Sequence, residues 1–449
     1  MSTSPLQQKS VMVIFTYAPA GLGHLRVTDA LYHGLPDGVD PIILGSQDSF
    51  IRLAHRFTSI HPIARSLFEW AQHGALTEIF TYFYRLFLRT QTKNLYRQMI
   101  TVTSQRIEFP QTVVVVATHY GMAQQIGAIK KKLMKALDIR IILVVQVTDD
   151  TPQHIWYVQG ADLIFVPSEQ TKKLMIQYGH NAHLQSSPFE VNPYPISPVL
   201  TEKLSDIQFE NRKHQLDPSN NSQLHITIPI SGAAVGTGYM STLIEELHLS
   251  SPRFLFHVVA KTAPFTDQFM YKMTRHSYVD LITSAHDRTI VDAYEQLYKK
   301  HIIGIEITKP SEQAFKTLAE PRQRGGSVIL LAEPVGQQEY DNMAFLRRHH
   351  LIPWASTLHQ LYHCAENNIK LDGDLKHFTH SHARRWRAVT LPTDPQKAAQ
   401  FITWCYNEGV FYEMALFDKA AYLKHSDYNH HEIGSNGVEL FWQKVSHLL

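Results

Sequence analysis

The chain has 449 residues, of which 44% are hydrophobic and 18% are charged, and its formal net charge at pH 7 is +2. This is the composition of a globular protein of two or three domains, at roughly 100–200 residues per domain, and its near-balanced charge argues against a dedicated nucleic-acid binder. Cys364 and Cys405 are the only cysteines, which excludes a disulfide framework and makes a reducing cytosol the expected compartment.

Neither a signal peptide nor a membrane span is predicted. The first ten residues lack an apolar core, and no stretch reaches the ~20 uninterrupted apolar residues of a spanning helix. We therefore expect any membrane contact to be made at the surface. Histidine occurs 27 times, so a histidine becomes a candidate only where its neighbours single it out.

The first motif lies at residues 11–31. Residues 11–15 are an apolar run rich in β-branched side chains, which indicates a strand buried on both faces of a parallel sheet. Gly21 and Gly23 follow in a turn that allows a ligand to approach closely, and a helix is expected to begin near His24. The N–H groups of such a helix start can meet an anion or a polar substrate.

The rest of the first half alternates strands with helices. Residues 50–107 are helical and aromatic in character, without a clear strand. The further predicted strands are 41–45, 113–119, 141–147 and 162–166. This alternation predicts a doubly wound parallel sheet, with His119 and Asp149 at the carboxyl ends of two of its strands.

Residues 76–97 carry an apolar stripe and a basic stripe at helical spacing. The apolar residues are Leu76, Ile79, Phe80, Phe83 and Phe87, and the cations are Arg85, Arg89, Lys93 and Arg97. An apolar face bordered by cations suits an anionic membrane surface. A core helix with a solvated basic side is the alternative.

A second alternating domain follows a linker. Prolines, charged residues and a run of Asp, Pro, Ser and Asn place the linker at 201–222, after a first domain at 1–200. The second domain is expected at 223–392, with strands at 225–230, 254–260, 302–307 and 327–332. Helices at 393–449 are expected to pack back across both domains.

Three loops of the second domain stand where ligands bind, beyond the carboxyl ends of strands. The glycine-rich turn at 231–238 can present N–H groups to a phosphate, although a purely structural turn is the alternative. The loop at 306–313 contains Lys309, and the loop at 333–342 is rich in side-chain amides that can bind sugar hydroxyls.

The motifs in these loops resemble those of the GT-B glycosyltransferases related to MurG and the monogalactosyldiacylglycerol synthases. The matching segments, in consistent order over residues 11–350, are Gly-Leu-Gly-His at 21–24, Val-Thr-Asp at 147–149, Val-Pro-Ser-Glu at 166–169, Ile-Thr-Lys-Pro-Ser at 307–311 and Pro-Val-Gly-Gln-Gln-Glu-Tyr-Asp-Asn at 334–342. The resemblance implies two Rossmann-like domains facing a central cleft.

The same resemblance implies sugar transfer from a nucleotide sugar, most readily a UDP-sugar, to an acceptor hydroxyl, with a lipid as one candidate acceptor. His24 is the implied general base, with Asp149 and His119 beside it and with Gly21 and Gly23 in the acceptor-side loop. A structural histidine that caps its own helix is the alternative for His24. The implied donor-binding residues are Ser231, Gly232, Gly236, Gly238, Lys309, Ser311, Glu312, Gln337, Gln338 and Asn342.

Neither a metal nor a resident cofactor is expected, because the nucleotide sugar is a substrate and adjacent acids such as Asp149 and Asp150 direct their side chains apart. Partners other than the donor and an anionic membrane surface at 76–97 are not predicted. The position where the family's ribose-binding glutamate is expected falls near Thr317. This departure motivates one alternative, a degenerate glycosyltransferase acting as a ligand-binding or scaffolding protein; a nucleotide-sugar epimerase is the other.

Overall fold

The computed structural model describes residues 4–17, 22–45, 75–232, 234–424 and 431–449. Gly21 lies outside these residues, and for residues 75–82 only the backbone is described. The chain forms two compact units, residues 1–197 with 436–449 and residues 198–435. Among the described residues, none of the helices is long and apolar enough to cross a membrane.

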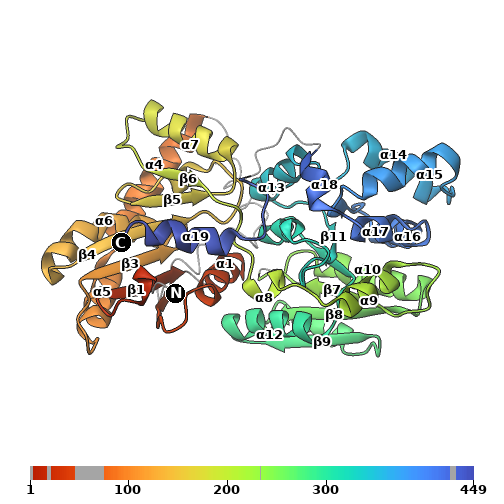
Figure 1. The fold of residues 1–449 in the computed structure, drawn as a ribbon, viewed down its shortest axis with the longest axis horizontal. Helices are drawn as coiled ribbons and strands as arrows, with labels where there is room; N and C mark the ends of the chain where they lie inside the picture. The colour runs from red at the N-terminus through yellow and green to blue at the C-terminus, as the bar shows by residue number, and fades with distance from the viewer. Residues whose placement is uncertain (1–3, 18–21, 46–74, 233, 425–430) are drawn as a thin grey trace. The chain divides into compact units, whose positions relative to one another are not determined.

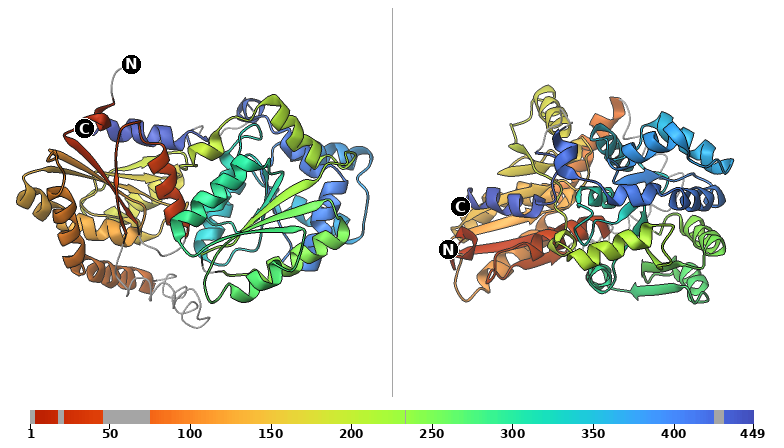
Figure 2. Two further views of the ribbon diagram at one scale, coloured as in Figure 1. Left: turned by 90° about the horizontal axis from the view of Figure 1, so that it is seen from below. Right: turned by 45° about the vertical axis from the view of Figure 1, so that its right-hand side comes forward.

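The first unit contains a six-stranded parallel sheet in the order β2-β1-β3-β4-β5-β6, with helices on both faces (Figures 1 and 2). Its strands are β1 (Val11–Tyr17), β2 (Ile42–Gly45), β3 (Thr112–Ala117), β4 (Arg140–Gln146), β5 (Leu163–Val166) and β6 (Phe189–Val191). Its helices are η1 (Pro5–Gln7), α1 (Leu22–His33), α4 (Ala75–Thr90), α5 (Lys93–Ser104), α6 (Tyr120–Leu137), η2 (His154–Trp156), α7 (Glu169–Asn181) and α19 (Gly437–Ser446).

The second unit contains another six-stranded parallel sheet, in the order β12-β11-β10-β7-β8-β9. Its strands are β7 (Leu224–Pro229), β8 (Phe254–Lys261), β9 (Val279–Ser284), β10 (Ile305–Thr308), β11 (Val328–Leu331) and β12 (Ala388–Thr390). Its helices are α8 (Pro198–Thr201), α9 (Asp206–Leu216), α10 (Thr237–Ser250), α11 (Asp267–Met273), α12 (Asp287–Lys300), η3 (Glu312–Leu318), α13 (Gln337–Arg348), α14 (Ala355–Glu366), α15 (Gly373–Ala383), α16 (Pro395–Asn407), α17 (Val410–Ala415) and α18 (Lys419–Lys424). The predicted class, α/β with two doubly wound Rossmann-like domains, is confirmed by these two sheets.

The central strands form where the sequence is continuously apolar. In β3, for example, the five residues from Val113 to Ala117 are all fully buried, because helices cover both faces of the sheet. Three strands were not predicted, namely β6, β9 and β12, and all three lie at an edge of their sheet. Edge strands are short or alternate between buried and exposed residues, so they lack that signal.

The boundary between the units differs from the predicted linker at 201–222. This segment contains α9, which belongs to the second unit. The guanidinium of Arg212 on α9 is fully buried and donates hydrogen bonds to the carbonyl oxygens of Ile303, Pro321 and Arg324 at 3.0, 2.6 and 2.6 Å. Burial lowers the pKa of Arg212 to about 10. The polar composition of this segment therefore reflects a helix that anchors loops rather than a free linker.

The last residues of the chain return to the first unit. Helix α19 packs on its sheet through Phe441 and Trp442, which lie 4.9 and 6.0 Å, between ring centroids, from Phe165 and Phe15 respectively. The indole N–H of Trp442 also donates to the carbonyl oxygen of Leu31 at 2.9 Å. The predicted C-terminal helices at 393–449 are thus divided, with 436–449 in the first unit and 393–435 in the second.

Candidate functional site

The first unit brings together side chains from the carboxyl ends of three adjacent strands. His24 lies in the first turn of α1 after β1, His119 follows β3, and Thr148 and Asp149 follow β4. Strand β2 lies on one side of β1, whereas β3 and the strands that follow it lie on the other side. The order in which strands are added therefore reverses between β1 and β3. Such a switch point is where open α/β sheets bind ligands, since the adjoining loops diverge there.

Thr148 connects His24 to Asp149. The Thr148 hydroxyl lies 3.2 Å from Nδ1 of His24 and donates to Oδ2 of Asp149 at 3.3 Å. A hydroxyl has one proton, so when it donates to the carboxylate it can only accept from His24. In this arrangement a neutral His24 carries its proton on Nδ1.

The backbone of His24 is also held in place. Its carbonyl oxygen accepts from the hydroxyl groups of Thr28, at 2.8 Å, and Thr118, at 3.2 Å. These two hydroxyls lie 2.7 Å from each other. These hydrogen bonds hold the first turn of α1 against the end of β3. They thereby fix the backbone position from which the half-buried His24 side chain extends.

His119 stands next to His24, with ring centroids 4.9 Å apart and the planes at 84°. It is buried and caps α6, with its Nδ1 accepting from the N–H of Gly121 at 3.1 Å. The imidazole can cover the start of α6 because residue 121 is glycine: a Cβ there would lie 3.0 Å from Cε1 of His119. A neutral His119 thus carries its proton on Nε2.

The two adjacent acids serve different partners. Asp150 is buried and accepts from the hydroxyls of Ser168 and Thr171 at 2.5 and 2.8 Å, which joins the loop after β4 to the start of α7. Asp149 is only half-buried and accepts from Thr148. Asp150 is thus a structural residue, and Asp149 is the acid of this pair beside His24.

Helix α4 contributes to the same region in a way that the sequence pattern does not show. Tyr84 packs on Tyr120, with ring centroids 6.4 Å apart, and burial raises the pKa of Tyr120 well above its usual value. Arg85 is buried, with 5% of its surface exposed, and donates to the Tyr178 hydroxyl at 2.6 Å. Arg85 therefore faces the protein and does not belong to a solvated basic stripe.

The opposite side of α4 is apolar and exposed. Phe83, Leu86 and Phe87 expose 61%, 50% and 39% of their surface. Leu76, Ile79 and Phe80 belong to the part of α4 whose side chains lie outside the described residues. Over its described part, α4 thus buries Arg85 together with Leu88 and exposes Phe83, Leu86 and Phe87.

In the second unit, the loops after β7, β10 and β11 lie together at the carboxyl end of the sheet, because these three strands are adjacent and parallel. The switch point of this sheet lies between β7 and β10. Gly236 caps α10 with φ +85°, a conformation that favours glycine, and a Cβ atom there would lie 3.6 Å from Cε of Lys309. Lys309 also donates to the carbonyl oxygen of Glu333 at 3.3 Å, so it connects all three loops.

A buried ionic cluster supports the Lys309 loop. Glu306 on β10 pairs with Lys316 on η3, and both side chains are almost fully buried. Tyr294 also donates to Glu306, at 2.6 Å, and burial raises the pKa of this tyrosine well above its usual value. Thr317, at the position of the family's expected glutamate, is buried, with its hydroxyl donating to the carbonyl oxygen of Ala314 at 2.7 Å.

The other predicted donor residues have mixed surroundings. Asn342 is fully buried and donates to the carbonyl oxygen of Pro310 at 3.1 Å, so its amide holds α13 to the Lys309 loop. Gln337 and Gln338 are exposed in the first turn of α13, where Gln337 donates to Asp341 at 2.8 Å. In the second unit, Ser231, Gly232, Ser311 and Glu312 are half-buried and Gly238 is exposed. Gly23, in the first unit, is half-buried.

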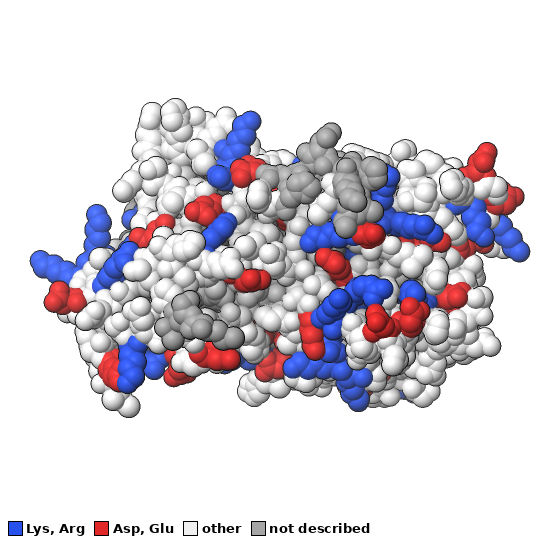
Figure 3. Space-filling model, in the orientation of Figure 1, with Lys and Arg blue, Asp and Glu red and all other residues white. Residues whose placement is uncertain are grey.

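Thr148 is the residue of this site that sequence reasoning missed. A threonine at the end of a strand is common, and only the folded arrangement places it between His24 and Asp149. On the face shown in Figure 3, positive and negative side chains are interspersed, so a patch of one sign does not mark a site there.

No family model and no curated protein matches the chain. Among solved structures, it is similar to the UDP complex of MnaA from S. aureus, at 10% identity and a TM-score of 0.49 over 97% of this chain and 96% of that one. HepE from Anabaena, in complex with UDP and glucose, is 13% identical, with a TM-score of 0.47 over 98% and 100% of the two chains. MurG from Acinetobacter baumannii is 10% identical, with a TM-score of 0.45 over 98% and 99%. Activity does not transfer at such identities, and the Rossmann-like class of each unit rests on its own strand order.

Proposed function

We propose that this protein is a glycosyltransferase that moves a sugar from a nucleotide sugar, such as a UDP-sugar, to an acceptor hydroxyl. The observation that carries the proposal is the chain of hydrogen bonds from Asp149 through Thr148 to Nδ1 of His24. It supports a base whose Nε2 is unprotonated, at a sheet position where ligands bind.

In the proposed reaction, Nε2 of His24 takes the proton of the acceptor hydroxyl while the oxygen attacks the anomeric carbon of the sugar. The bond from that carbon to the nucleotide diphosphate breaks, and its electron pair leaves with the phosphate oxygen. Imidazole suits this task because it titrates near neutral pH. His119, whose Nε2 carries a proton in the neutral tautomer, is assigned to orient the acceptor.

The second unit is proposed to bind the donor diphosphate. Lys309 supplies a positive charge, and α10 begins one residue after Gly236, so its first N–H groups lie in the same loop. A helix N-terminus and a lysine together can stabilise the charge that develops on a leaving phosphate. Asp150 already accepts hydrogen bonds at the start of α7, so of the two adjacent acids only Asp149 lies beside His24. This difference supports a metal-independent reaction.

The acceptor is proposed to be a lipid that the protein meets at a membrane surface. The exposed side chains of Phe83, Leu86 and Phe87 support this proposal, because an apolar helix face of this kind can enter the interface of a bilayer. Lys93 and Arg97 on α5 are exposed and can add attraction to anionic lipids.

The decisive experiment replaces His24 by alanine and measures both turnover and UDP binding. Loss of a general base lowers turnover about 10²- to 10⁴-fold, whereas UDP affinity is expected to stay unchanged because the donor residues lie in the other unit. His180→Ala is the matched control, since His180 is an exposed histidine of the first unit. Wild-type turnover in His24→Ala would refute the assignment.

The same assay separates the two alternatives. An epimerase would convert the nucleotide sugar without any acceptor, and a degenerate glycosyltransferase would bind UDP without turnover. Donor and acceptor are therefore supplied separately and together, with a panel of nucleotide sugars and with lipid and non-lipid alcohols.

A further inference from the structure

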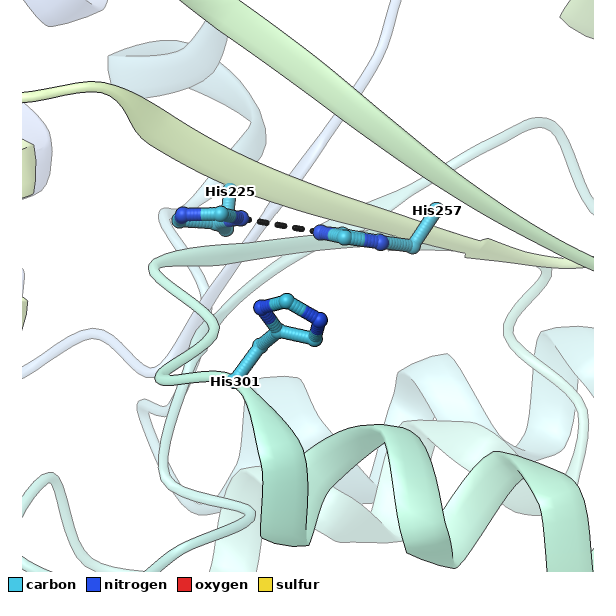
Figure 4. A group of neighbouring side chains, drawn as sticks. All are labelled: His225, His257 and His301. Atoms are coloured by element: carbon cyan, nitrogen blue, oxygen red, sulfur yellow. Dashed lines mark hydrogen bonds between the residues drawn. The ribbon is translucent and has the colours of Figure 1, made fainter. Parts of the chain in front are cut away.

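Three histidines of the second unit converge at a place remote from the loops described above. His225 is the second residue of β7, His257 lies on β8 and His301 caps the carboxyl end of α12 (Figure 4). One ring nitrogen from each lies within 4.8 Å of the others. The group is at the amino end of β7, whereas Gly236 and Lys309 follow the carboxyl ends of their strands.

The sheet register explains how the histidines meet. Thr227, two residues after His225, pairs with His257, so His225 and His257 point to the same face of the sheet. His257 in turn pairs with Asp280 on β9, which places a carboxylate on that face as well. Helix α12 leads into β10 and ends over this row, and its terminal carbonyl groups favour a nearby cation.

The hydrogen bonds define which nitrogen of His257 is available to a metal. Nδ1 of His257 lies 3.1 Å from Oδ2 of Asp280, and Nε2 lies 2.9 Å from Nδ1 of His225. Because a carboxylate only accepts, Nδ1 of His257 carries the proton and Nε2 presents a lone pair. A histidine oriented by a carboxylate in this way is the usual form of a metal-bound histidine.

The spacing suits a transition metal. Two nitrogen ligands at about 2.0–2.1 Å from a tetrahedral zinc ion lie roughly 3.3 Å apart. The 2.9 Å between His225 and His257 therefore has to open slightly, and His301, whose ring nitrogen lies within 4.8 Å of the other two, has to move toward the ion. His257 is buried, whereas His225 and His301 are half-buried, so an ion can enter and a fourth position can face solvent. Three imidazoles form a ligand set that zinc accepts.

We infer that His225, His257 and His301 form a binding site for Zn²⁺, with Asp280 orienting His257 and water as the fourth ligand. Binding exchanges the hydrogen bond between His225 and His257 for two coordinate bonds, and the His225 proton moves to its Nε2. The site is separate from the proposed sugar transfer, and its test requires no turnover.

Burial and neighbouring charges act on all three histidines. Burial, followed by the neighbouring His257 and His301, lowers the pKa of His225 to about 4. Burial also lowers the pKa values of His257 and His301. Lys300 is the nearby charge that opposes a cation, and Asp280 partly offsets it.

The test is a metal titration of the full-length, chelator-treated protein. We expect one equivalent of Zn²⁺ to bind by calorimetry, and one equivalent of Co²⁺ to give the intense visible absorption of a four-coordinate site. His301→Gln should weaken binding at least about 10-fold, and Asp280→Asn about 10- to 100-fold. His377→Gln, an exposed histidine of α15, is the matched control and should bind like the wild type.

The variants also allow a clear negative result. His301 caps a helix end and is half-buried, so its replacement leaves the sheet intact; far-ultraviolet circular dichroism without metal checks the fold of each variant. If His301→Gln and His377→Gln bind Zn²⁺ equally, or if Co²⁺ gives only the weak spectrum of a six-coordinate ion, the proposal is wrong. The three residues would then form only a hydrogen-bonded histidine network.

Discussion

At the scale of single residues, the position of one proton decides whether His24 can act as a base. The Thr148 hydroxyl donates a hydrogen bond to Asp149 and so accepts one from Nδ1 of His24. In the proposed reaction it is then Nε2, not Nδ1, that accepts the proton of the acceptor hydroxyl. The role of His24 therefore depends on a neighbour that carries no charge.

Thr148→Val tests this dependence. Thr148 exposes 1% of its surface, and valine has nearly the same shape and fits this position. Valine cannot accept the hydrogen bond that keeps the His24 proton on Nδ1. We expect kcat to fall about 10²-fold without a change in nucleotide affinity, and Thr148→Ser to restore most of the activity. Equal turnover in the valine and serine variants would show that the hydroxyl has no such role.

Lys309→Ala tests the phosphate-binding role in the second unit. A hydrogen bond to a charged group contributes about 1.5–3 kcal/mol, so UDP should bind roughly 10- to 100-fold more weakly, as measured by calorimetry. The affinity for uridine, which has no phosphate, should not change. Lys376→Ala, at an exposed lysine of α15, serves as the control. An equal loss for UDP and uridine would place Lys309 away from the phosphates.

At the scale of elements, α4 shows that a helical pattern does not reveal which face is buried. The cations and apolar residues of 76–97 alternate at helical spacing, but Arg85 faces the protein and Phe83 faces outward. The partners of Arg85 are the hydroxyl of Tyr178 and, more weakly, the carbonyl oxygen of His154, and both come from segments far along the chain. Burial of a charged side chain requires such partners, and they exist only in the folded unit.

Removal of the apolar face should separate membrane binding from folding. We expect the double variant Phe83→Ser with Leu86→Ser to lose at least about 10-fold in binding to anionic vesicles, since each side chain contributes apolar area, as measured by cosedimentation. Ile207→Ser, on α9, removes a single residue that exposes 83% of its surface and should have no effect. Equal sedimentation of all three proteins would refute a role for α4.

At the scale of the whole molecule, the first unit is completed by the last residues of the chain. Gly437 begins α19 against the backbone of Pro193, where a Cβ would lie 2.2 Å from the Pro193 carbonyl oxygen, so only glycine allows this approach. Trp442, with 4% of its surface exposed, then covers β1 and α1. The first unit, which contains His24, is thus stabilised from both ends of the sequence.

Trp442→Ala should therefore loosen the first unit in particular. Removal of a buried tryptophan costs about 3–5 kcal/mol, so amide hydrogen exchange in β1 should become roughly 100-fold faster or more. Exchange in β7 and β8 of the second unit should remain unchanged, and Glu439→Ala, on the exposed side of α19, should have little effect. Equal acceleration of amide exchange in both units would contradict the assignment of α19 to the first unit alone.

The sequence by itself determined the α/β class, the central strands and the loops that bear candidate ligands, because buried parallel strands are continuously apolar and their carboxyl ends are polar. The edge strands β6, β9 and β12 depended on the neighbouring strand for their pairing. Only the tertiary structure decided that Thr148 joins His24 to Asp149, that Arg85 faces inward and that three histidines distant in sequence meet. These are matters of side-chain direction and of contacts between remote segments, which a local pattern of residues does not encode.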